Sequence, residues 1–159
     1  MPGKSLAATA VLVLVLLSLA LGALARAGPP PYGALLIDCD GTEHVFPLDG
    51  EVYVIYNWTH SVEGTIIMEE YRVDPQKGLV LVLAAAKSFG AGHPYNAEEL
   101  GGTFYYKGDL MYYTANLSMG GEIDIAAPAE YGGNITVLWN TARIMVCPSF
   151  QQGSIRVLP

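Results

Sequence analysis

Short segments in which apolar and polar residues alternate make up most of the chain from residue 34 onward, and this alternation constrains the fold more than any other feature. The segment Glu51–His60 shows it best, because it is rich in the β-branched and aromatic residues that favour strands. One face of this predicted strand carries Val52, Val54, Tyr56, Trp58 and His60, and the other carries Tyr53, Ile55, Asn57 and Thr59. We expect the first face to lie in the core, with His60 at the inner end of an aromatic row and Asn57 pointing outward.

Ten further segments are strand-like, and Gly, Pro, Asn and Asp separate them at spacings of about 8–12 residues. They are residues 34–38, 42–46, 65–73, 78–86, 103–106, 109–116, 121–126, 134–140, 142–147 and 154–158. Segment 78–86 is almost entirely apolar and should be covered on both faces. Residues 106–109 predict a tight hairpin turn, and only residues 97–101 have helical character. The pattern predicts a single all-β domain, either a β-sandwich or a partly open β-barrel.

The N-terminal part of the chain contains an uncharged apolar run from Leu6 to Ala25. A helix of that length spans about 30 Å, enough to cross the hydrocarbon core of a bilayer. Lys4 and the α-amino group precede the run, which favours a cytoplasmic N-terminus and a translocated body. We therefore expect three regions: a signal anchor or cleaved signal peptide at 1–27, a proline-rich spacer at 28–33, and an extracytoplasmic all-β domain at 34–159. The protein is then a single-pass protein of the cell membrane, or a secreted one if the N-terminal segment is removed.

The body of the chain is strongly acidic. Residues 32–159 contain six Lys and Arg residues and fifteen Asp and Glu residues, a net charge of −9. Such a surface lacks the basic patch that neutralises phosphates, which argues against nucleic acid and against electrostatic docking to anionic lipid.

Two sets of residues bear on export. Cys39 and Cys147 are the two cysteines of the chain, and in an oxidising compartment they could form one disulfide that closes a loop of about a hundred residues. The alternative is two buried thiols. Three Asn-x-Ser/Thr sequons begin at Asn57, Asn116 and Asn134 and are compatible with surface glycosylation.

His60, Ser61 and Glu70 are the candidate catalytic residues. In a hydrolase Ser61 would attack, His60 would act as base and a carboxylate would orient the imidazole. Neighbours on a strand point to opposite faces, so His60 and Ser61 would meet only if the turn redirects one of them. The alternative is that Ser61 shapes the turn while His60 bonds a carbonyl group or Glu70.

A metal site would gather His60 and His93 with one of Glu63, Glu69 or Glu70, a ligand set that suits zinc or iron. The sequence contains no His-x-x-x-His and no closely paired cysteines to support this interpretation. We expect neither a metal nor a cofactor.

The segment Gly90-Ala91-Gly92 could present its N–H groups as a nest for an anion. Lys87, Ser88, His93 and Tyr95 flank it, so a carboxylate ligand could be held there; the alternative is a glycine-rich corner between sheets. The candidate ligand-binding residues are His60, Ser61, Glu63, Glu70, Lys87, Ser88, Gly90, Gly92, His93 and Tyr95.

At these segments the sequence resembles the family known as domain of unknown function 1850. The resemblance rests on His60-Ser61-Val62-Glu63, on the acidic pair Glu69-Glu70 in the following strand, and on Ser88-Phe89-Gly90-Ala91-Gly92-His93-Pro94, and it covers roughly Ala34 to Leu158. At His93 the family pattern has an apolar residue such as Leu, so no family role is assigned to His93.

The resemblance implies a small, N-terminally anchored, exported protein. Members of the family are often encoded beside tripartite ATP-independent periplasmic (TRAP) transporters that use a TAXI-class solute-binding protein. We therefore expect an accessory or ligand-binding component of a transporter for small organic acids, with the permease or the binding protein as partner. The alternatives are a small extracytoplasmic hydrolase built on His60, Ser61 and Glu70, or a structural surface glycoprotein.

Overall fold

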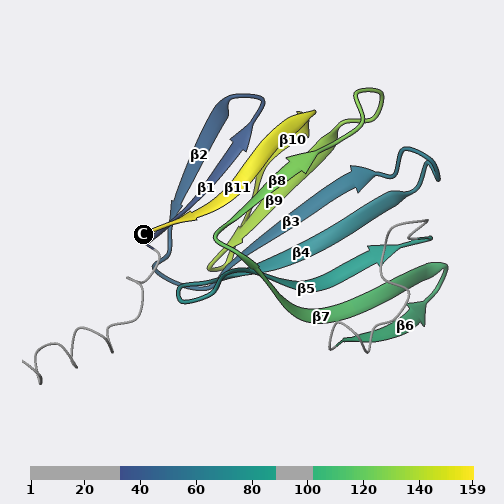
Figure 1. Cartoon of the computed structure of the whole chain (residues 1–159), viewed down its shortest axis with the longest axis horizontal. Coiled ribbons are helices and arrows are strands. Elements are labelled where there is room, and N and C mark those ends of the chain that lie inside the picture. Colours follow the sequence, from purple (N-terminus) through teal and green to yellow (C-terminus); the bar gives the residue numbers. More distant parts are fainter. Residues whose placement is uncertain (1–32, 89–101) are drawn as a thin grey trace, which may run out of the picture. The chain divides into compact units, whose positions relative to one another are not determined.

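The structure is a computed structural model that describes residues 33–88 and 102–159 (Figure 1). The chain divides into two units, residues 1–30 and 31–159, and all described residues belong to the second. The predicted anchor at 1–27, most of the spacer and the helical segment 97–101 lie outside the described residues. The described residues include no helix that is long and apolar enough to cross a membrane.

Every segment predicted as a strand is a strand in the structure, and the described residues contain no helix. The all-β prediction is therefore confirmed. The strands are β1 (Ala34–Cys39), β2 (Thr42–Pro47), β3 (Val52–Thr59), β4 (Ile66–Asp74), β5 (Gly78–Ala86), β6 (Thr103–Lys107), β7 (Leu110–Gly120), β8 (Glu122–Ala126), β9 (Gly133–Trp139), β10 (Ala142–Phe150) and β11 (Gln152–Leu158). The predicted turn at 106–109 is also present, since Lys107 pairs with Leu110 across it.

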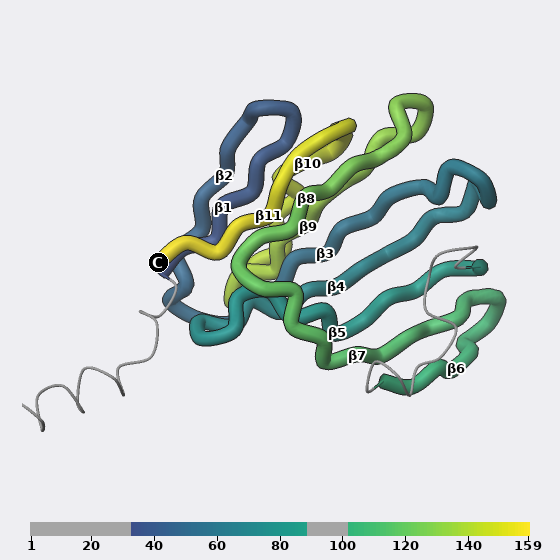
Figure 2. The backbone as a smooth tube through the Cα atoms, viewed as in Figure 1, coloured from purple at the N-terminus to yellow at the C-terminus, as the bar shows by residue number. Residues whose placement is uncertain are grey.

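The strands form two antiparallel sheets. The small sheet has the order β2-β1-β11-β8, and the large sheet has the order β10-β9-β3-β4-β5-β7-β6. Figure 2 traces the chain from β7 into β8, where it leaves the large sheet and becomes the edge strand of the small one. The order places β3 and β4 at the centre of the large sheet and leaves β8 with a partner on one side only.

The two sheets share a hydrophobic core. Leu35, Ile37 and Ile155 of the small sheet pack with Val54 and Val137 of the large sheet, and all five are fully buried. The expected core face of β3 is confirmed, because Val52, Val54 and Tyr56 belong to this cluster and Trp58 packs against it.

A second, smaller cluster is built only from strands of the large sheet. Its buried members are Ile67, Ala84, Ala86 and Tyr113. Trp58 packs against both clusters, so its indole lies where the two apolar regions meet.

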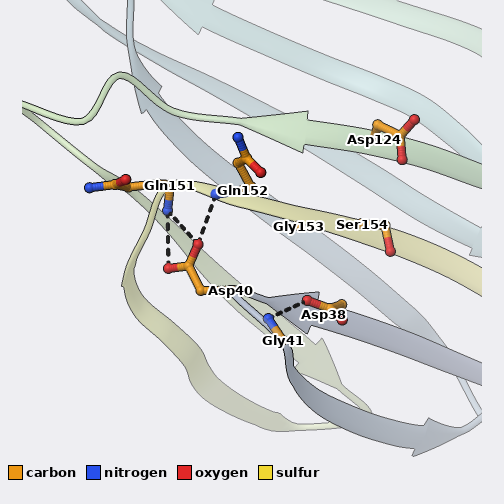
Figure 3. Close-up of a pocket in the computed structure, with 8 residues that line it drawn as sticks. All are labelled: Asp38, Asp40, Gly41, Asp124, Gln151, Gln152, Gly153 and Ser154. Carbon is orange, nitrogen blue, oxygen red and sulfur yellow. Dashed lines mark hydrogen bonds between the residues drawn. The ribbon is translucent and has the colours of Figure 1, made fainter.

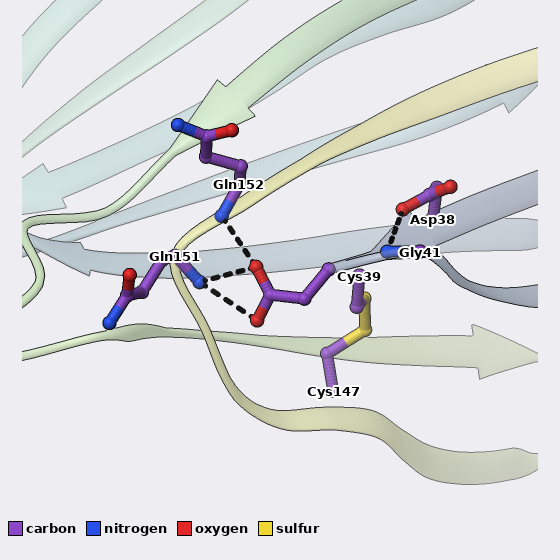
Figure 4. The surroundings of a disulfide bond; sticks show 7 residues. Asp38, Cys39, Gly41, Cys147, Gln151 and Gln152 are labelled. Atoms are coloured by element: carbon purple, nitrogen blue, oxygen red, sulfur yellow. Dashed lines mark hydrogen bonds between the residues drawn. A yellow bond between two sulfur atoms is a disulfide. The ribbon is translucent and has the colours of Figure 1, made fainter.

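A disulfide joins the two sheets. Cys39 at the end of β1 is bonded to Cys147 in β10, with the two Cα atoms 6.3 Å apart (Figure 4). Both residues are buried in the shared core. The pairing that the sequence left open is therefore formed, and it connects strands 108 residues apart.

The β1–β2 turn is fastened to the same region. Asp40 has a φ of 51° and Gly41 a φ of 85°, the left-handed conformations that a tight hairpin turn requires. The Asp40 carboxylate accepts hydrogen bonds from the backbone N–H groups of Gln151 and Gln152 at 3.0–3.2 Å (Figure 3). These bonds hold the turn against the corner between β10 and β11.

Candidate functional site

A cleft of about 360 Å³ opens where the edge strand β8 approaches the inner face of β3 and β4. Its volume falls within the range of small-molecule sites. The lining residues are Tyr56, Trp58, Glu69, Tyr71, Met119, Ile123, Asp124, Ile125 and Ala126. Strands β3 and β4 therefore supply the aromatic side chains and Glu69, whereas β8 and the end of β7 supply the opposite wall.

Strand register places Glu69 in this cleft. Tyr56 of β3 lies directly opposite Glu69 of β4, and Trp58 lies opposite Ile67. Because alternate residues of a strand share a face, Glu69 projects on the same side as Ile67 and Tyr71. Tyr71 belongs to the shared core and Ile67 to the second cluster, so Glu69 is a carboxyl group between two apolar regions.

The surroundings of Glu69 change its acidity. The Tyr71 hydroxyl donates a hydrogen bond of 2.8 Å to Oε2 of Glu69. Burial raises the pKa of Glu69, and the hydrogen bonds from the side chains of Tyr71 and Trp58 oppose that rise only in part. Burial, with the nearby charge of Glu69, also raises the pKa values of Tyr71 and Tyr56, so both phenols stay protonated. The Tyr56 hydroxyl donates to the carbonyl oxygen of Ala126 at 2.7 Å and thereby ties β3 to β8.

The predicted aromatic row ending in His60 is confirmed. The ring centroids of Tyr56 and Trp58 are 6.4 Å apart, and those of Trp58 and His60 are 5.9 Å apart. Nδ1 of His60 accepts hydrogen bonds from the backbone N–H groups of Val62 and Glu63, each at 3.3 Å. Through these two hydrogen bonds the imidazole holds the turn after β3 in place.

The structure does not bring the candidate catalytic residues together. Glu70 lies opposite Ile55 and Leu83 in its two ladders, on the face of the sheet that looks away from the cleft. Ser61 is an exposed residue of the turn, as is Glu63. Glu69, one residue earlier than the predicted Glu70, is the carboxylate on the face that carries His60.

Sequence reasoning named Glu69 only as a possible metal ligand and as part of the acidic pair, but the same reasoning could have placed it in a cleft. It shares its parity with the apolar positions 67, 71 and 73, which marks the same face of the strand. A lone carboxylate on an apolar face is a signal for a polar site in the core.

Ser88, the first residue of the second family motif, lies beside Thr65, which follows the turn after β3. The Thr65 hydroxyl donates to the carbonyl oxygen of Ser88 at 3.5 Å. Nζ of Lys87 lies 2.8 Å from Oδ2 of Asp109, and this bond between two exposed side chains raises the pKa of Lys87 and lowers that of Asp109. Gly90, Gly92, His93 and Tyr95, and with them the predicted anion nest, lie outside the described residues.

A second recess, of about 570 Å³, lies beside this turn. Gly64, Thr65, Ile66, Met68, Ala85, Lys87, Leu110 and Tyr112 line it. Ile66 and Met68 alternate with Ile67 and Glu69 along β4, so this groove is on the opposite face of the large sheet from the cleft.

A third recess, of about 600 Å³, is acidic and includes Asp38, Asp40 and Asp124 (Figure 3). Asp38 accepts the N–H of Gly41 at 2.9 Å, and Asp40 holds the β10–β11 corner as described above. Among the described residues, no group of three or more His, Cys, Asp or Glu side chains is arranged to hold a metal ion.

The sequon asparagines differ in their surroundings. Asn57 and Asn134 face each other across β3 and β9, and Nδ2 of Asn57 donates to Oδ1 of Asn134 at 2.9 Å. Both are half-buried, whereas Asn116 on β7 is exposed.

The described residues thus define a disulfide-linked all-β domain with a carboxyl-bearing cleft beneath the edge of its small sheet. The chain belongs to a family described as Domain of unknown function (DUF1850), whose sequence model matches residues 54–144, more than half of the chain. The match begins in β3 and ends in β10, so it includes Glu69 and the turn at His60. Neither a curated protein nor a solved structure matches the chain.

Proposed function

We propose that the protein is a membrane-tethered β-sandwich on the extracytoplasmic face, where it serves as a non-enzymatic accessory component of a TRAP-type secondary transporter for small organic acids. The apolar run at 6–25 supports the tether, as a single-pass helix or as a signal segment that is removed. The family resemblance supports the transporter, through the genes that accompany family members.

The observation that carries the proposal is exposed apolar surface around the first family motif. Val62 is 84% exposed and Ile66 is 65% exposed. With Met68, Leu110 and Tyr112 in the adjoining groove, they form what we call the motif surface. Large apolar side chains gathered at the surface are a feature of protein interaction sites.

Because the protein is tethered to the membrane, a modest contact surface is sufficient for binding a membrane partner. Confinement to the membrane raises the effective concentration of a membrane partner, so a weak interface is occupied for much of the time. The Lys87–Asp109 pair beside the groove is internally neutralised, which leaves apolar contact as the main source of affinity there.

The test is a crosslinked pull-down of the full-length protein from its native membranes, with partners identified by mass spectrometry. The test variant is Val62→Asp/Ile66→Asp. The matched control is Val45→Asp, because Val45 is 61% exposed on β2 of the other sheet. We expect the wild type and the control to recover a multi-spanning permease or its solute-binding protein, and the double variant to lose it.

Thermal unfolding of the three proteins confirms that each is folded. Recovery of neither transporter component by the wild type contradicts the transporter role. If the double variant recovers the transporter component as well as the wild type does, the transporter role stands, but the motif surface is not the interface.

A further inference from the structure

The hydrogen-bonding groups around the cleft beneath β8 are unequally divided between donors and acceptors. The hydroxyl of Tyr71 donates to Glu69, and that of Tyr56 donates to the carbonyl of Ala126. The Trp58 side chain also hydrogen-bonds Glu69. Each of these donors is therefore already engaged within the protein, so what the lining offers to a ligand is mainly acceptor oxygens and ring surfaces.

The charged groups of the cleft have one sign. Glu69 lies on its floor, and none of the described lining residues is Lys, Arg or His. Asp124 lies at the rim, where its exposed side chain alternates with Ile123 and Ile125 and so belongs to the outer face of β8. Asp124 also lines the acidic recess of Figure 3, which extends the negative region beyond the cleft. An anionic ligand would meet repulsion here, and a cation would meet attraction strengthened by the −9 charge of the body.

Glu69 retains the capacity to bind a ligand. A carboxylate has about four acceptor positions on its two oxygens. The Tyr71 hydroxyl uses one at Oε2, and the Trp58 side chain uses another. A carboxylate removed from water is stabilised when a positive group pairs with it. A ligand that donates hydrogen bonds or brings positive charge supplies that partner.

Aromatic and apolar side chains complete the site. The rings of Tyr56 and Trp58 are stacked, with their planes 21° apart. Tyr56 is buried and Trp58 is half-buried, so the indole is the more accessible ring, and aromatic rings attract organic cations. Met119, which is partly exposed, and Ile123 provide apolar contact for alkyl groups.

We propose that this cleft binds an organic ammonium ion, with Glu69 as its counter-charge and Trp58, Tyr56 and Met119 as its apolar wall. A sugar or another neutral polyol fits less well, because its hydroxyls need donors as well as acceptors. The site is separate from the motif surface, which lies on the opposite face of the large sheet, and the proposal does not depend on the transporter role.

The test is isothermal titration calorimetry on the full-length protein in detergent, with three probes. Choline carries the cation, 3,3-dimethylbutan-1-ol is its uncharged isostere, and acetate is an anion. We expect choline to bind, the isostere to bind at least about tenfold more weakly, and acetate not to bind.

The variant Glu69→Gln keeps the size of the side chain and removes its charge, and it should weaken choline binding by about tenfold. Glu70→Gln is the matched control, since it makes the same change on the other face of the strand and should leave binding unchanged. Asp124→Asn removes an exposed carboxylate at the rim, and it should weaken choline binding by no more than a few fold.

Displacement of bound choline by glycerophosphocholine would identify a lipid headgroup as the source of the ligand, and its failure to displace would identify a free amine. The proposal is overturned if choline does not bind, if the uncharged isostere binds as well as choline, or if Glu69→Gln and Glu70→Gln bind choline equally.

Discussion

Removing the disulfide between Cys39 and Cys147 should cost this domain a large part of its stability. The bond closes a loop with a sequence separation of 108 residues. For such a loop the chain-entropy model gives about 4.8 kcal/mol at 25 °C, because the cross-link restricts the unfolded chain. Single domains are stable by about 5–15 kcal/mol, so the reduced protein should remain folded only narrowly or not at all.

The measurement is urea unfolding of the full-length protein in detergent, in its oxidised form, in its reduced form and as Cys39→Ala/Cys147→Ala. Unfolding is followed by the fluorescence of Trp58 and Trp139, which both pack against the shared core. Trp139 of β9 makes an edge-on contact with Phe46 of β2, with centroids 6.1 Å apart, and so senses separation of the sheets. We also expect a steeper dependence on urea without the bond, because the unfolded chain then exposes more surface.

The control is reductant added to the double variant, which should leave its free energy of unfolding unchanged. If reduction of the wild type lowers the free energy of unfolding by less than about 1 kcal/mol, well below the range typical of native disulfides, the entropic reasoning is refuted. The sheets would then be held by their shared core alone.

Glu69→Gln should stabilise the protein increasingly as pH rises. Burial raises the pKa of Glu69 above its ordinary value of 4.5, so the stability of the wild type is complete below that pH and falls as the native carboxyl ionises. The free energies of unfolding of the two proteins should agree at acidic pH and separate at neutral pH, by about 1.4 kcal/mol for each unit of pKa shift measured by NMR. An equal difference at every pH would contradict this. In a host that glycosylates sequons, mass spectrometry should find Asn116 occupied and should find no chain with glycans on both Asn57 and Asn134, since each side chain is the other's hydrogen-bond partner. A doubly occupied pair would show that these strands pair differently.

The transporter association, the membrane location and the glycosylation remain predictions. The exposed surface around the first family motif and the cleft beneath β8 give each functional proposal a defined set of residues to change. The two sets do not overlap, so one proposal can fail without the other.

Local sequence was enough to locate the strands. Alternation with a period of two marks which residues share a face, and Gly108 in a two-residue turn sets where β6 and β7 meet. The core face of β3 could be predicted in the same way, because four apolar or aromatic residues share one parity there. These features depend on neighbours within a few residues, so the sequence by itself determines them.

Only the tertiary structure decided how distant segments combine. The order of the strands, the position of β8 at a sheet edge and the meeting of Cys39 with Cys147 depend on pairings between residues far apart in the chain. The same holds for the cleft around Glu69. Parity with Ile67, Tyr71 and Val73 marks the apolar face on which Glu69 lies, but only the packing of the small sheet against β3 and β4 brings β8 over that face and forms the cleft.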